Sequence, residues 1–62
     1  MITFKKMRKL VSRHGFSLGK SHVSPYKFVL KNNETNAERH YHELEDIGPD
    51  VEELLEGMTP FA

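Results

Sequence analysis

Apolar residues near the start of the chain recur every three or four positions, which is the spacing of an amphipathic helix. The stripe consists of Ile2, Phe4, Met7, Leu10 and Val11. Thr3 is suited to cap the amino end of this helix, and Gly15 is suited to end it in a left-handed conformation. The pattern therefore predicts a first helix over residues 2–14.

The middle of the chain alternates between apolar and polar residues, as strands with one buried face do. Residues 16–18 predict a short first strand, and residues 19–21 predict a turn. Residues 26–31 are rich in aromatic and β-branched side chains and predict the central strand. Polar residues at 32–36 predict a hairpin turn. The alternation at 37–44 then predicts a third strand paired with the second.

A second helix is predicted over residues 47–57. Pro49 suits its first position, and Gly57 suits its end. Asp50 and other acidic residues occupy the first turns, where the helix dipole favours negative charge. The predicted apolar stripe consists of Val51, Leu54, Leu55 and Met58.

The order α-β-β-β-α predicts one α+β domain over residues 1–62. A three-stranded antiparallel sheet with two helices packed on one face buries both apolar stripes with the fewest layers. A chain of 62 residues has room for one small core, because a domain of this size buries only about 60% of its unfolded surface. Formation of a homodimer would add buried area, and the sequence leaves that question open.

The chain contains no cysteine, and no apolar run approaches the length of about 20 residues that spans a bilayer. Disulfides and thiolate metal sites are therefore excluded as stabilising elements. We expect a cytoplasmic protein without a membrane partner.

Charge is divided between the two halves of the sequence. Residues 1–31 carry eight basic residues and no acidic one, whereas residues 32–62 carry nine acidic residues and the single base Arg39. The halves have formal charges of +8 and −8, although the net charge is zero. Such asymmetry points to binding surfaces more than to a particular fold.

Three short segments resemble the HicA (YcfA-like) toxins of bacterial toxin–antitoxin pairs. They are Arg13-His14-Gly15-Phe16 at the end of the first helix, Gly19-Lys20-Ser21-His22 at the opening of the central strand, and residues 42–49 before the last helix. Members of that family are small mRNA-cleaving proteins with a double-stranded-RNA-binding-domain-like fold. The resemblance implies metal-independent RNA cleavage in which His22 is the general acid or base.

The candidate site residues fall into three groups. Residues that can bind nucleic acid or an acidic partner are Lys5, Lys6, Arg8, Lys9, Arg13, Lys20 and Lys27. Residues that can bind a basic partner are Glu45, Asp46, Glu52, Glu53 and Glu56. The candidate catalytic residue is His22. Glu38, His40 and His42 share one face of the third predicted strand, but solvent-facing histidines are far commoner there than ligands, so we assign no metal and no cofactor.

Two hypotheses about function follow. The favoured one is a small regulatory or accessory protein, of the kind that phages and mobile elements encode, which binds and modulates a protein partner through its charged faces. The alternative is a HicA-like ribonuclease toxin that binds RNA through the basic first helix. Size and charge balance favour the first hypothesis, and the short motifs favour the second. Whether the chain is an enzyme stays open.

Overall fold

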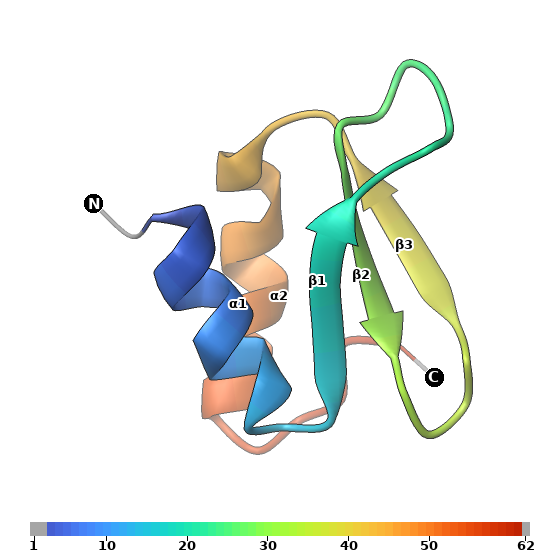
Figure 1. The fold of residues 1–62 in the computed structure, drawn as a ribbon. Coiled ribbons are helices and arrows are strands. Elements are labelled where there is room, and N and C mark those ends of the chain that lie inside the picture. Colours follow the sequence, from blue (N-terminus) through green and yellow to red (C-terminus); the bar gives the residue numbers. More distant parts are fainter. Residues whose placement is uncertain (1–2, 62) are drawn as a thin grey trace.

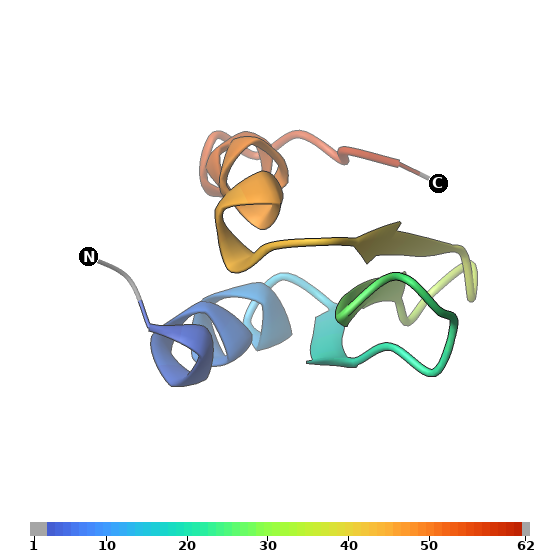
Figure 2. The same ribbon diagram turned by 90° about the horizontal axis from the view of Figure 1, so that it is seen from above.

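The computed structural model describes residues 3–61. Its elements in chain order are helix α1 (Phe4–Ser12), strands β1 (Phe16–Lys20), β2 (Phe28–Asn32) and β3 (Glu38–Tyr41), the 3-10 turn η1 (Leu44–Ile47) and helix α2 (Gly48–Leu55). The predicted order α-β-β-β-α is confirmed. The three strands form one antiparallel sheet in the order β1-β2-β3, and both helices lie on one face of it (Figures 1 and 2).

Helix α1 begins and ends for local reasons that the sequence reveals. The Thr3 hydroxyl accepts a hydrogen bond from the backbone N–H of Lys6 at 3.2 Å, which satisfies one donor of the first turn. Gly15 has a φ of 81°, a left-handed conformation that glycine adopts without steric cost. The helix is shorter than predicted at both ends, and the predicted stripe residue Ile2 lies outside the described residues.

The first strand is longer than the alternation predicted. Gly19 and Lys20, which we expected in a turn, belong to β1 and pair with Val29 and Phe28 of the central strand. The prediction of a turn at 19–21 was wrong, because pairing with β2 supplies backbone hydrogen bonds that extend β1 to the full length of its neighbour. The connection to β2 begins only at Ser21, and the central strand begins at Phe28 instead of residue 26.

Asn32 organises the hairpin between β2 and β3. Its side-chain oxygen accepts hydrogen bonds from the backbone N–H groups of Glu34, at 2.9 Å, and Thr35, at 3.4 Å. Asn36 completes the turn in a left-handed conformation, with a φ of 66°. The polar segment 32–36 therefore forms the predicted turn because an asparagine side chain can imitate a backbone turn.

The apolar stripe of the second helix differs from its prediction. Ile47, Val51 and Leu54 are buried, whereas Leu55 and Met58 are 55% and 51% exposed. Leu55 lies about 100° around the helix from Leu54, on the solvent side. Met58 follows the end of α2 and therefore leaves the helical register.

One core fills the space between the helices and the sheet. It consists of Met7, Val11, Phe16, Leu18, Leu30, Tyr41, Ile47, Val51 and Leu54. The carboxyl-terminal segment closes one end of this core, where the Phe61 ring meets the Phe16 ring edge-on at 5.4 Å. The Asn32 side-chain amide holds that segment by donating to the carbonyl of Phe61 at 3.3 Å. The opposite sheet face, which includes Ser17, is covered by neither helix (Figure 2).

Two leucines provide a matched test of this core. Leu30 is fully buried in the central strand, while Leu55 is mostly exposed. We expect Leu30→Ala to lower the free energy of unfolding by about 2–5 kcal/mol, which would unfold much of so small a domain. Leu55→Ala should change it by less than about 0.5 kcal/mol. Urea titration monitored by circular dichroism measures both, and equal effects would contradict the described packing.

Candidate functional site

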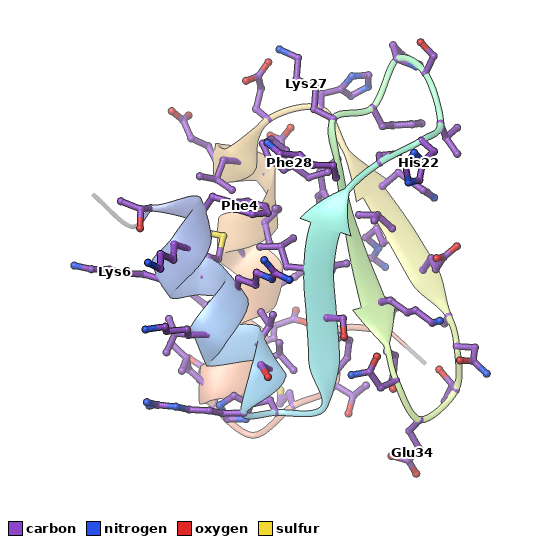
Figure 3. The ribbon with its side chains drawn as sticks, viewed as in Figure 1. Phe4, Lys6, His22, Lys27, Phe28 and Glu34 are labelled. Atoms are coloured by element: carbon purple, nitrogen blue, oxygen red, sulfur yellow. The ribbon has the colours of Figure 1, made fainter. Side chains whose placement is uncertain are left out.

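The basic residues of α1 gather on its solvent side. Lys5, Arg8, Lys9, Ser12 and Arg13 line a shallow hollow of about 480 Å³. Their spacing of three and four residues stacks successive side chains along one face of a helix. Lys6 is also exposed and points away from the sheet (Figure 3). We call Lys5, Lys6, Arg8, Lys9 and Arg13 the basic face.

The other two predicted basic residues lie outside this stripe. The Lys20 ammonium lies over the rings of Phe4 and Phe28, 4.9 and 4.8 Å from their centroids. This cation–π arrangement places Lys20 at the amino end of α1. Lys27 is the last residue of the loop between β1 and β2, and its ammonium lies 3.8 Å from a carboxylate oxygen of Glu43.

The predicted acidic residues also share one region. Glu45 and Asp46 belong to η1, Glu52 and Glu53 belong to α2, and Glu56 follows directly after it. All are exposed except Glu53, which is half-buried. One carboxylate oxygen of Asp46 accepts the Glu43 backbone N–H at 3.1 Å, so this residue also caps η1. We call Glu45, Asp46, Glu52, Glu53 and Glu56 the acidic face.

The basic and acidic faces do not neutralise each other through direct contacts. Within residues 3–61 the ion pairs are Lys27–Glu43 and Arg39–Asp50, and neither includes a residue of the two faces. Helices α1 and α2 nevertheless contact each other and lie side by side in one layer (Figure 2). The helix layer therefore presents opposite charges on adjacent flanks.

His22 does not open the central strand, as the resemblance led us to expect. It lies in the loop that follows β1, six residues before β2 begins at Phe28. Its side chain is exposed, and Figure 3 places it on the opposite side of the molecule from Lys6. The structure therefore does not bring His22 together with the basic face, because the longer β1 and its loop carry this histidine away from α1.

A cluster of aromatic and imidazole side chains lies where the β1–β2 loop, which carries His22, meets the end of β3. The Tyr26 ring packs against His40 and His42, with centroid distances of 5.7 and 4.6 Å. The Ser21 hydroxyl oxygen lies 2.7 Å from Nδ1 of His40, a hydrogen bond that fixes the imidazole and leaves Nε2 for other contacts.

The Ser21–His40 pair lacks the surroundings of a nucleophilic site. The Ser21 hydroxyl already accepts the Val23 backbone N–H at 3.0 Å, and the Ser21 backbone N–H donates to the Lys27 carbonyl at 3.0 Å. Acyl transfer requires N–H donors that stabilise an oxyanion. The backbone N–H groups of Ser21 and Val23 are not free for this, because both already donate hydrogen bonds. The pair therefore positions the loop against β3. Within the described part of the chain, no three His, Cys, Asp or Glu side chains are grouped so as to hold a metal ion.

A network of charged and polar side chains lies at the edge of the core and was not anticipated from the sequence. A guanidinium nitrogen of Arg39 donates to both carboxylate oxygens of Asp50 at 3.2 Å, and the Tyr41 hydroxyl donates to the same carboxylate. Burial, followed by the hydrogen bond and negative charge of Asp50, raises the pKa of Tyr41 well above its ordinary value of 10.0. Because Asp50 belongs to α2 and its two partners belong to β3, the network joins the helix to the sheet and is structural.

A faint signal of this network exists in the sequence. Arg39 is the only base of the acidic half, and Arg39 and Tyr41 share one face of an alternating strand. Their partner Asp50 is one of nine acidic residues, so its role could not be singled out.

Comparison of the chain with protein-family models, with curated proteins and with solved structures found no match. Within residues 3–61, no helix combines the length and the apolar character that crossing a membrane requires.

The raised pKa of Tyr41, caused first by burial and then by Asp50, predicts a loss of stability at alkaline pH. Above pH 10 an unfolded tyrosine loses its proton while the buried Tyr41 keeps it, so the unfolded state binds fewer protons and the free energy of unfolding falls as pH rises. Tyr41→Phe should lower that free energy by about 1–3 kcal/mol at neutral pH and flatten its decline above pH 10. Urea titrations at several pH values measure this. Tyr26→Phe is the matched control and should leave the decline unchanged.

Proposed function

We propose that this protein is a small regulatory or accessory module that binds and modulates a protein partner. It acts in the cytoplasm, without a metal or cofactor of its own, and docks through its basic and acidic faces. The observation that carries this proposal is the placement of two oppositely charged helices side by side, with their charged groups directed to solvent instead of to each other.

The adjacency of the two faces favours a protein over a nucleic acid as the partner. A long polyanion bound along α1 would be repelled by the carboxylates on the neighbouring α2, because that helix lies in the same layer. A protein surface can instead present both signs of charge in a complementary arrangement. Such complementarity raises association rates and suppresses incorrect partners.

Removal of positive charge from helix α1, compared with its removal from the uncovered face of the sheet, tests this proposal. We expect Arg8→Gln/Lys9→Gln to weaken capture of a protein partner from host lysate about 10-fold or more, since both cations line the hollow on α1. Lys31→Gln removes a cation from the opposite sheet face and should leave capture unchanged. Quantitative pull-down at several salt concentrations measures both effects. Equal capture by all variants, or capture of RNA instead of protein, would contradict the proposal.

A second candidate is the HicA-like ribonuclease that the sequence resemblance implies. The observation that favours it is the exposed basic face of α1, carried by a domain with the order α-β-β-β-α. In this candidate the basic face binds RNA phosphates, and His22 acts as general acid or base in attack by the 2′-hydroxyl.

RNA binding and cleavage test the second candidate separately. Affinity for single-stranded RNA should fall as salt rises. A plot of the logarithm of the binding constant against the logarithm of the salt concentration should have a slope of about −0.7 for each phosphate contacted. His22→Ala should abolish cleavage, whereas His14→Ala, an exposed histidine just after α1, should retain it. Gel-based cleavage and fluorescence anisotropy measure the two properties. Absence of RNA binding at low salt would eliminate this candidate.

A further inference from the structure

The solvent side of α2, together with the residues that directly follow it, combines negative charge with uncovered apolar surface. Leu55 and Met58 are 55% and 51% exposed, which makes them the most exposed large apolar residues of the described chain. Leu55 lies three residues after Glu52 and directly before Glu56. The side chains of both glutamates are exposed. An exposed apolar patch with a polar rim is typical of a protein-binding surface.

The solvent side of α1 has the complementary properties. Its hollow is lined by Lys5, Arg8, Lys9, Ser12 and Arg13, and the lysine and arginine side chains contribute methylene stems as well as charges. Lys5 and Lys9 are four residues apart, and so are Lys9 and Arg13. Glu52 and Glu56, the residue that caps the end of α2, have the same separation, and four residues correspond to about 6 Å along a helix axis. The two helices therefore present opposite charges at matching intervals.

These stripes cannot meet within one molecule. Helices α1 and α2 already face each other and the sheet through their buried sides. Their charged sides point outward, and within residues 3–61 no ion pair joins them. Direct pairing of one stripe with the other therefore requires a second molecule.

We propose that the hollow on α1 receives α2 of a second copy of this chain. Leu55 of one copy enters the hollow between the methylene stems, and Glu52 and Glu56 pair with cations on either side of it. This inference rests on the proposed docking function and names a partner for its two faces. The contact joins two different surfaces, so the growing assembly keeps one free basic face at one end and one free acidic face at the other, and association continues head to tail.

The contact is weak and sensitive to salt. Two helices of nine and eight residues bury an area at the low end of specific interfaces, below about 1,200 Å². Attraction between exposed charges weakens as salt rises, because the Debye length falls from about 30 Å at 0.01 M to about 3 Å at 1 M. Self-association therefore rises with protein concentration at low ionic strength and disappears at high ionic strength.

Sedimentation velocity and light scattering between about 10 µM and 1 mM protein test this inference. We expect the average mass of the wild type to rise with concentration in 20 mM NaCl, without stopping at a dimer, and to remain that of a monomer in 500 mM NaCl. Arg8→Gln/Lys9→Gln and Glu52→Gln/Leu55→Asn should each weaken self-association about 10-fold or more, because each removes one of the two surfaces. Lys31→Gln is the matched control and should associate like the wild type.

Mixing the two double variants gives the decisive result. Each should be monomeric alone. The first keeps α2 intact and the second keeps α1 intact, so a 1:1 mixture should form a heterodimer that grows no further. Unchanged urea midpoints would show that both variants are folded. A mixture that stays monomeric, a wild type that stays monomeric at all concentrations, or a wild type that saturates as a dimer would each overturn the inference. Continued capture of another protein by a monomeric wild type would leave the proposed docking function intact.

Discussion

The carboxylate of Asp50 joins helix α2 to the edge of the sheet, and much of the structure depends on this contact. Asp50 is 8% exposed and accepts hydrogen bonds from Arg39 and Tyr41, both on β3. A buried carboxylate without such partners would cost several kcal/mol, so the network fixes where α2 can lie on the sheet. The Arg39 guanidinium also lies over the Phe61 ring at 4.9 Å, which ties the carboxyl-terminal segment to the same point.

This placement of α2 determines the distribution of charge over the surface. Once Asp50, Val51 and Leu54 are directed inward, Glu52, Leu55 and Glu56 are exposed on the remaining surface. The packing of Met7 and Val11 leaves the cations of α1 on its outer side in the same way. The bipolar helix layer is thus a consequence of core packing, and it is the feature on which the proposed docking function rests.

The opposite face of the sheet has a different character. Ser21, Tyr26, His40 and His42 form a cluster held by one hydrogen bond and by ring contacts, away from both helices. The cluster anchors the long β1–β2 loop to β3, and this loop carries His22. Extension of β1 through Lys20 is what separates His22 from the basic face, and the resemblance based on three short segments did not include that extension.

The sequence by itself determined the order of the elements, because helical and strand periodicities are local properties of neighbouring residues. It also determined the caps at Thr3 and Gly15 and the turn at Asn32, since each depends on one side chain or one glycine acting within a few positions. The division of charge was likewise visible in the chain. The tertiary structure alone decided that Gly19 and Lys20 pair in β1, that Leu55 faces solvent and that Phe61 packs. It also decided that Asp50 is the acidic residue that accepts hydrogen bonds from Arg39 and Tyr41. Those outcomes depend on partners far away in the sequence, and no local pattern encodes which distant side chains will meet.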